Sequence, residues 1–393
     1  MKSSKALGGG FLLFVLLFSA FPFAHSSILN GGNGLTYVKS AWNLKQGYLT
    51  LYGRNRFFGK VASVPQNVIA SAVTFWDVQG ALSFNYGISE HFELAISPVM
   101  YQDNHKGGPG YNFPDDLFLG LKLGSHKLKG TSLTWAVSLD SRFPTAKYHN
   151  VPFEPYSAGT VEWGFTGMMT YSRDPLYPED AVNVHVNLGY VNHNDVGKKL
   201  TTSIKDNVSV TSMTQQFFYG LGLKIPTSDF DFSVELYGNK FIQKPPPATA
   251  YSVEEYLYLT PGVSFKAYRW LTLNFATDLR LTADTDETLY INSTKFHDMP
   301  NYPGWRINLG VSILLLPTSV YQLSDKDILM KKAESRRELF EQIIKEQRET
   351  ESAEEELDRI KEERRKAERE LERLRRILEG DSKKKKEDDP SSK

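Results

Sequence analysis

Residues 72–86 have the sequence AVTFWDVQGALSFNY, in which apolar and polar side chains alternate. One parity contains Trp76, Val78, Leu82, Phe84 and Tyr86, and the other contains Asp77, Gln79, Ser83 and Asn85. A period of two predicts a β-strand with one apolar face and one polar face. The stretch exceeds the about 5–6 residues of a usual strand, but it suits a tilted strand that crosses a bilayer, which needs about 9–11 residues.

The same alternation recurs through most of the chain, and twelve strands are predicted within residues 47–316. A soluble β-sandwich also has strands with one apolar face, so alternation alone does not decide the class. The connections alternate between short and long, aromatic residues lie near strand ends, and the strand number is even, as in outer-membrane barrels. We therefore predict an all-β transmembrane antiparallel up-and-down barrel.

A barrel of fourteen strands is the alternative. In it, residues 35–38 form one more strand, and a further strand is split from the long stretch that includes residues 72–86. We prefer twelve, because the parity through residues 76–82 never slips, as it would at a turn.

The beginning of the chain has the organisation of a secretory signal peptide. Lys2 and Lys5 precede an apolar run at residues 11–18, and the small-x-small sequence Ala24-His25-Ser26 follows. We expect residues 1–26 to be a signal peptide. A retained anchor helix is the alternative, although the apolar run is short for a membrane span. The chain has no cysteine, which excludes lipidation at a leading cysteine, disulfide bonds and thiolate metal sites.

The charge distribution divides the chain in two. Overall, 46 basic residues balance 46 acidic residues, so no nucleic-acid partner is predicted. From residue 324 to the end, however, 43 of 70 residues are charged and none is Trp or Tyr. We expect a domain boundary at residues 316–324, next to Pro317. Residues 27–46, before the first strand, are predicted to be a periplasmic lead-in, with a short segment folded inward as the alternative.

Residues 324–380 are predicted to form a long periplasmic α-helix with coiled-coil patterning, and therefore a homo-oligomer. The alternative is a single solvated helix held by ion pairs three or four residues apart, because several core positions are polar. Residues 381–393 are predicted to be a disordered charged tail that begins after Gly380. The predicted coiled-coil core consists of Leu329, Leu339, Ile343, Ala353, Leu357, Ile360, Ala367, Leu371, Leu374 and Leu378.

Residues 308–315, with the sequence NLGVSILL, combine a polar residue, a glycine and hydrophobic residues two apart. This strand resembles the C-terminal recognition signal of bacterial outer-membrane proteins, although it does not end the chain. The sequences YGISEHFEL at residues 86–94 and DLFLGLK at residues 116–122 are similar to those of porin-like outer-membrane β-barrels. The resemblance implies a place in the bacterial outer membrane, contact with its lipid, and insertion by the outer-membrane assembly machinery.

The polar parity of the strands is predicted to line the lumen. Small inward residues favour open space there, namely Gly120, Gly164, Gly189, Gly220, Gly222, Gly262, Ser233 and Ser264. Barrels of about 8 strands are filled by side chains and barrels of about 16 leave a channel, so twelve strands fall between these limits. The candidate lumen-lining residues are Arg54, Arg56, Asp77, Glu93, Lys122, Asp140, Glu162, His185, Lys224, Asp231, Glu235, Lys266, Asp278, Arg280 and Arg306.

We expect a passive small-solute channel that is weakly selective, because the lumen charges of the two signs balance. The alternative is a structural anchor with a plugged barrel that presents the coiled coil for self-association or envelope spacing. The outward faces carry almost no Ser, His or carboxylate, and the histidines lack metal-ligand spacing. No catalytic, metal-binding or cofactor-binding residue is therefore assigned, and His185 is interpreted as a hydrogen-bonded interior residue.

Overall fold

The computed structural model describes residues 28–66, 69–105, 111–174, 177–200, 208–247, 250–283, 287–288, 301–318 and 325–387. The predicted signal peptide, residues 1–26, lies outside the described residues. The chain separates into two compact units, Met1–Gln322 and Leu323–Lys393. Among the described residues, no helix has the length and apolar character needed to cross a membrane.

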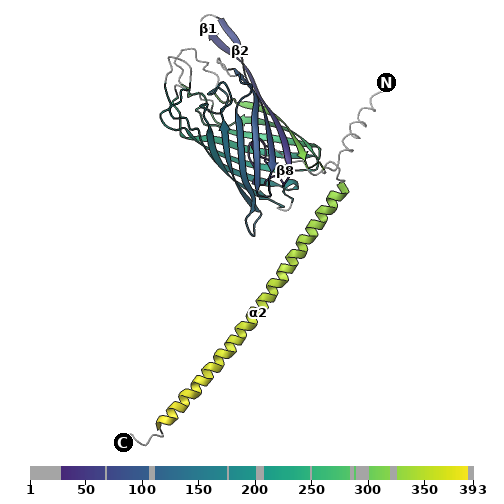
Figure 1. The fold of residues 1–393 in the computed structure, drawn as a ribbon, viewed down its shortest axis with the longest axis vertical. Helices are drawn as coiled ribbons and strands as arrows, with labels where there is room; N and C mark the ends of the chain where they lie inside the picture. Colours follow the sequence, from purple (N-terminus) through teal and green to yellow (C-terminus); the bar gives the residue numbers. More distant parts are fainter. Residues whose placement is uncertain are drawn as a thin grey trace, which may run out of the picture. The chain divides into compact units, whose positions relative to one another are not determined.

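The first unit contains a closed antiparallel barrel of twelve strands, each paired with its neighbours in the sequence (Figure 1). Pairing of β1 with β12 closes the barrel, and it places Arg54 opposite Gly310. The predicted all-β up-and-down barrel of twelve strands is confirmed. Residues 35–38 belong to no strand and β2 is continuous, which excludes fourteen. The strands are β1 (Leu49–Gln66), β2 (Ile69–Gly87), β3 (Phe92–His105), β4 (Leu117–Lys127), β5 (Leu133–Phe143), β6 (Glu162–Ser172), β7 (Asn183–Asn192), β8 (Gln215–Pro226), β9 (Phe230–Gln243), β10 (Leu257–Tyr268), β11 (Leu271–Arg280) and β12 (Trp305–Leu316), and a short 3-10 helix, η1 (Pro178–Asp180), precedes β7.

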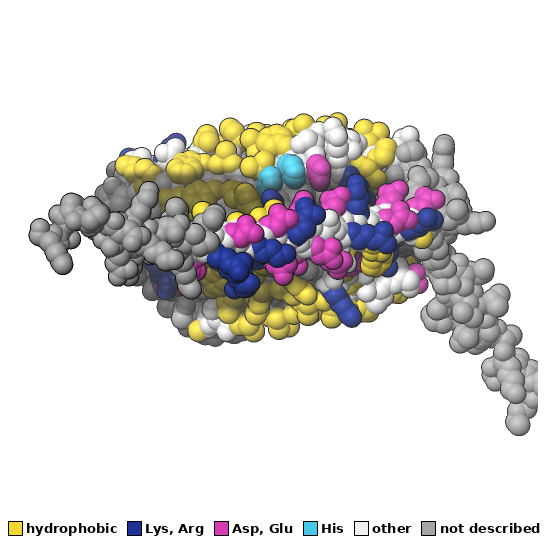
Figure 2. Space-filling model, turned by 90° about the horizontal axis from the view of Figure 1, so that it is seen from below, with side chains coloured by type: hydrophobic (Ala, Val, Ile, Leu, Met, Phe, Trp, Pro, Cys, Tyr) yellow, Lys and Arg dark blue, Asp and Glu magenta, His cyan; other side chains and the backbone are white. Residues whose placement is uncertain are grey.

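The outer wall of the barrel is apolar, and Figure 2 shows hydrophobic side chains spread over it. Leu188 and Leu309, for example, are 53% and 54% exposed, whereas their neighbours Asn187 and Asn308 are buried. A soluble monomer rarely exposes a contiguous apolar patch of more than a few hundred Å². A closed barrel satisfies its backbone polar groups internally, so its apolar wall can face hydrocarbon. The barrel is therefore of the transmembrane type.

The two ends of the barrel differ in the length of their connections. The short turns β2–β3, β4–β5, β8–β9 and β10–β11 lie at one end, where β1 begins and β12 ends. At the other end, the connections β3–β4, β5–β6, β7–β8, β9–β10 and β11–β12 span 11, 18, 22, 13 and 24 residues. The exceptions are β1–β2 at this end, with two residues, and β6–β7 at the short-turn end, with ten. Outer-membrane barrels have short periplasmic turns and long external loops. The barrel shares this asymmetry between its two ends.

Residues 28–46, hereafter the lumen segment, lie inside the barrel. Their backbone N–H groups donate to inner-wall side chains, as Asn30 does to Ser97 (3.0 Å) and Ala41 does to Thr170 (2.8 Å). The predicted periplasmic lead-in is therefore wrong. The physical reason is that the polar lumen wall offers side-chain acceptors, which satisfy the backbone of a segment without secondary structure of its own.

The second unit contains α2 (Asp325–Glu387), which continues beyond Gly380, where the sequence predicts an end. Every side chain described between residues 333 and 373 is exposed, and Figure 2 shows Lys or Arg mixed with Asp or Glu along this helix. Ion pairs three or four residues apart join Arg337 to Glu341 and Lys361 to Asp358. The predicted core residues in this range include Leu357 and thus lack burial within the chain. Self-association stays a prediction.

Leu188→Arg is expected to destabilise the barrel in lipid vesicles by about 2–4 kcal/mol, because it places a charge in hydrocarbon near the middle of β7. The measurement is the free energy of unfolding from urea titration in vesicles. Val196→Arg is the matched control, since Val196 is 55% exposed but lies in a long loop. Equal costs for the two variants would show that the outer wall does not meet hydrocarbon.

Replacing two predicted core residues of α2, in the variant Leu357→Glu/Ile360→Glu, is expected to dissociate the oligomer, because like charges then meet at the helix contact. Removing residues 324–393 is expected to have the same effect while the barrel still inserts. The measurement is the molecular mass in detergent by light scattering. Glu356→Gln/Arg359→Gln, on the flank of the helix, is the control. A truncated protein that stays oligomeric would contradict the prediction.

Candidate functional site

The inner wall carries the polar residues of the alternating pattern. Of the fifteen candidate lumen-lining residues, thirteen are buried, and Asp140 and Arg280 are half-buried. They fall into three groups, which contact the lumen segment, form ion pairs near the short turns, or surround a cavity.

Glu235 of β9 holds a tight turn of the lumen segment. Its carboxylate accepts the backbone N–H groups of Thr36 (2.7 Å), Tyr37 (2.8 Å) and Val38 (2.8 Å). The N–H of Leu35 closes the turn by donating to the carbonyl of Val38 at 2.9 Å. Successive N–H groups that converge on one anion form a concave binding nest. Glu235 thus acts as the anchor of this turn.

Glu93 of β3 joins two distant points of the lumen segment. Its carboxylate accepts the N–H groups of Gly32 (2.6 Å) and Leu44 (2.7 Å). On β4, the Lys122 ammonium donates to the carbonyl of Trp42 at 2.7 Å. Hydrogen bonds with one charged partner contribute about 1.5–3 kcal/mol each, so these contacts are stronger than neutral ones.

Asp140 of β5 and Asn187 of β7 bind the middle of the lumen segment. Asp140 accepts a hydrogen bond from the Asn30 amide (2.6 Å) and pairs with the Lys39 ammonium (2.8 Å). The Asn187 side chain accepts from the Lys39 N–H at 2.6 Å and donates to the Lys39 carbonyl at 2.8 Å. Only β6 separates β5 from β7 in the ring, so these contacts fix the middle of the segment to one side of the wall.

The lumen segment packs against small inward residues of the wall. A Cβ on Gly222 would lie 2.5 Å from Leu35 Cδ1, and one on Gly124 would lie 2.5 Å from Asn43 Oδ1. At Gly222 the end of the Leu35 side chain would have to shift. At Gly124 a Cβ would also lie 2.8 Å from the Ala41 carbonyl oxygen, so that position requires glycine. The expectation that Gly222 favours open space is therefore wrong, because the segment occupies that space.

Tyr37 connects the lumen segment to an aromatic cluster on the wall. Its ring stacks on Tyr237 with centroids 4.0 Å apart, and its hydroxyl donates to Asp278 at 2.6 Å. Arg306 pairs with the same carboxylate at 3.0 Å. The Arg306 guanidinium also lies 4.6 Å from the centroid of the Tyr258 ring, a cation–π contact.

Five further predicted residues of the wall also have partners. Near the short turns, Asp231 forms ion pairs with Lys224 (2.9 Å) and Lys266 (2.6 Å). His185 lies 2.9 Å from the hydroxyl of Thr170, which itself accepts the Ala41 N–H. Arg280 donates to the Tyr302 carbonyl at 2.7 Å. In the part of the chain that the structure describes, no group of three or more His, Asp or Glu could hold a metal ion.

The loop of residues 144–161 folds into the barrel from the end opposite the short turns. Glu154 forms an ion pair with Arg56 of β1 and accepts from Gln79 of β2 at 3.3 Å. Phe153 is fully buried against Phe58, with ring centroids 5.5 Å apart. Its φ of +69° is left-handed and costs roughly 1–2 kcal/mol, which burial of the ring offsets. The loop is thereby fixed inside the lumen.

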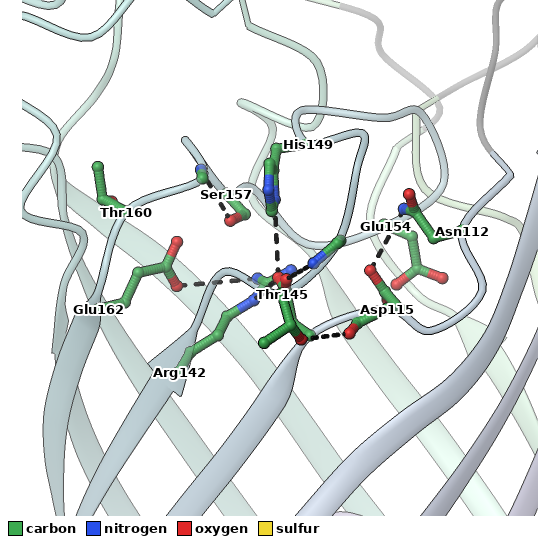
Figure 3. A network of polar contacts seen from close by, with 12 residues as sticks. Asn112, Asp115, Arg142, Thr145, His149, Glu154, Ser157, Thr160 and Glu162 are labelled. Carbon is green, nitrogen blue, oxygen red and sulfur yellow. Dashed lines mark hydrogen bonds and ion pairs between the residues drawn. The ribbon is translucent and has the colours of Figure 1, made fainter.

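Figure 3 shows the polar network at the base of this loop. Arg142 of β5 donates to Asp116 at 2.6 Å and lies 3.7 Å from Glu162 of β6. The Thr145 hydroxyl donates to the carbonyl of Asp115 at 2.6 Å. Burial, and then the neighbouring Asp116 carboxylate, raise the pKa of the Asp115 carboxyl to about 7. Asp115 lies in the loop before β4, outside the strands.

A cavity of about 430 Å³ lies between the lumen segment and the inward loop. This volume is within the about 300–1,000 Å³ of small-molecule sites, so the cavity is the candidate functional site. Its lining comes from the segment, the inward loop and the wall, including Tyr37, Lys39, Glu154, Tyr156, Arg54, Arg56, Asp140, Glu162 and Arg306.

Sequence reasoning missed the residues of the lumen segment and of the inward loop that line the cavity. Tyr37 and Lys39 precede the first strand, and Glu154 and Tyr156 lie in a long loop, so neither pair belongs to an alternating stretch. The glycine-rich sequence GGNG at residues 31–34 signals a turn, but it does not tell where the turn lies.

No protein-family model matches the chain, and no curated protein matches its sequence. Among solved structures, the chain is similar to the NanC porin (11% identity, TM-score 0.42, 67% of this chain and 98% of that chain). It is also similar to an outer membrane channel from Pseudomonas putida F1 (11% identity, TM-score 0.44, 70% and 98%). The translocator domain of the autotransporter NalP from Neisseria meningitidis matches at 9% identity and a TM-score of 0.36, over 68% and 88%. Because these values are low, function is argued from the residues of this chain.

Asp115→Asn is expected to stabilise the folded protein more at pH 8 than at pH 5. The folded-state pKa of about 7 lies above the unfolded value of about 4, so the wild type loses stability as pH rises through this window. The amide does not ionise and avoids that loss. The measurement is the difference in Tm between variant and wild type in detergent. A difference that stays constant or shrinks with pH would contradict the assigned pKa.

Proposed function

We propose that the protein is an outer-membrane channel for small solutes whose lumen is closed at rest by its own N-terminal segment. One observation carries this proposal: a separate segment, rather than side chains of the wall, fills the part of the lumen next to the short turns and borders a cavity. Narrow barrels of about 8 strands are filled by their own side chains. Twelve strands enclose more room, and that room becomes a path when the segment is displaced.

The contacts of the lumen segment support its displacement. It is held by hydrogen bonds and ion pairs, including those with Glu93 and Glu235, and by no covalent link to the wall. Water can replace each of these partners in an open lumen, because the carboxylates and N–H groups are then hydrated. The balance between closed and open states thus depends on the difference between protein and water contacts.

The charges along the path support weak ion selectivity. Lys39 pairs with Asp140, Arg142 with Asp116, and Arg306 with Asp278. Each pair presents both signs at the same level, so neither cations nor anions meet a strong barrier. The proposed orientation places α2 in the periplasm, because it follows β12 at the short-turn end.

A structural anchor is the second candidate function. The occupied lumen and the exposed apolar positions of α2, such as Leu357 and Ile360, favour it. In this reading the barrel holds α2 at the membrane for self-association or envelope spacing. The two candidates differ in one respect, because only the channel requires the lumen segment to move.

A disulfide between the lumen segment and the wall is expected to lock the channel shut. A Cβ on Gly220 of β8 would lie 3.8 Å from the Cβ of Val38, which matches the about 3.8 Å of a disulfide. The chain contains no native cysteine, so the new bond has no competitor. The oxidised V38C/G220C variant should show no single-channel openings in planar bilayers. Reduction should restore the openings of the wild type.

The single variants V38C and G220C are the matched controls and should conduct under both redox conditions. Openings of the oxidised double variant, with the disulfide verified by mass spectrometry, would contradict closure by the segment. No openings of the wild type or of a variant without residues 28–46, despite verified insertion, would favour the anchor over the channel.

A further inference from the structure

We propose that the cavity binds a small organic carboxylate, with the guanidinium of Arg54 as the group that recognises its charge. The inference deepens the proposed channel function, on which it rests, by naming the class of solute. The inference rests on the burial of Arg54 without an acidic partner among the described residues and on the side chains that line the cavity around it.

Arg54 is a buried cation without an acidic partner among the described residues. It is 7% exposed, it lines the cavity, and its Nε has no hydrogen-bond partner. Its guanidinium carbon lies 5.2 Å from the centroid of the Tyr37 ring. Arginine stays protonated at every physiological pH, and a buried charge without a counter-ion is costly. A bound anion would therefore supply the counter-ion that the Arg54 guanidinium lacks.

The other cations of the cavity lining differ from Arg54, because each has a carboxylate partner. The pairs are Lys39 with Asp140 (2.8 Å), Arg56 with Asp77 (3.2 Å), Arg142 with Asp116 (2.6 Å) and Arg306 with Asp278 (3.0 Å). An anion that approached one of these cations would compete with a fixed carboxylate. Arg54 has no such competitor, so it is where a carboxylate binds.

The position of Arg54 leaves room for a ligand. It lies opposite Ala81 on the neighbouring strand β2, and this small residue also lines the cavity. The planar guanidinium can donate two parallel N–H hydrogen bonds to the two oxygens of a carboxylate, which adds geometric specificity.

The rest of the cavity suits a ring-sized body with a second polar group. Its lining contains the aromatic residues Tyr37, Phe218, Tyr219, Tyr237 and Tyr256, whose faces can contact a sugar or an aromatic ring. On β8, Gln216 is 1% exposed and its amide Nε2 has no hydrogen-bond partner. It lines the same cavity and offers a donor away from Arg54. Sugar acids and aromatic acids share this chemistry.

The test is calorimetric titration of the folded full-length protein in detergent with glucuronate and with benzoate. Glucose and benzyl alcohol are the uncharged counterparts. At least one carboxylate should bind, and its uncharged counterpart should bind at least about tenfold more weakly, as the loss of a charge-assisted contact implies. The carboxylate that binds identifies the ring type. Equal binding of acids and uncharged counterparts, or no binding of either acid, overturns the proposal.

Two variants at the site and one outside it complete the test. Arg54→Gln should weaken carboxylate binding at least about tenfold, and Arg54→Lys, which keeps the charge, should weaken it less. Lys129→Gln removes an exposed cation from the β4–β5 turn and should leave binding unchanged. Heat-modifiable electrophoretic mobility verifies folding of each variant. A folded Arg54→Gln variant that binds as tightly as the wild type overturns the proposal.

Calorimetry separates this inference from the channel function, because binding in detergent needs no conduction. Carboxylate binding that depends on Arg54 in a protein without single-channel openings would overturn the channel and support the site. Openings in a protein that binds neither acid would support the channel and overturn the site.

Discussion

Hydrocarbon offers no hydrogen-bond partner, and this constraint determines how every polar group of the barrel is satisfied. Backbone groups pair in the closed ring from β1 to β12, and polar side chains must find their partners inward. Most wall charges pair with each other, as Asp231 does with Lys224 and Lys266. Glu93 and Glu235 are instead satisfied by backbone N–H groups of the lumen segment. The wall and the segment therefore complete each other's hydrogen bonding.

The same reciprocity sets the energetic scale for opening the lumen. Glu235 accepts three N–H groups and Glu93 accepts two, and each bond contributes about 1.5–3 kcal/mol net of the water contacts that it replaces. Displacement of the segment admits water, which solvates the same carboxylates and N–H groups. The cost of opening is thus a difference between two satisfied states, and it is far smaller than the gross strength of about 4–6 kcal/mol that each bond has without competing water.

Alternation is a local property. Together with the connection lengths, the aromatic residues near strand ends and the even strand number, it was sufficient to predict the barrel and its twelve strands. The inward positions of Asp77 and Glu235 were predicted from the parity of their strands alone. The lumen segment could not be found in this way, because residues 28–46 lack periodicity and their contacts join positions far apart in the sequence, such as Val38 and Glu235. The small inward residues were misinterpreted for the same reason: Gly222 signals a close neighbour, and its own strand does not identify that neighbour as Leu35.

Arg54 lies where the wall and the lumen segment meet, and this position couples occupancy of the cavity to closure. A carboxylate on the guanidinium would lie beside the Tyr37 ring, which belongs to the segment. A ligand shifts a conformational equilibrium only by its differential affinity for the two states. Because Tyr37 is part of the binding surface only while the segment is in place, a bound solute favours the closed state. Displacement of the segment then removes this contact and weakens binding, so that opening and release of the solute are linked.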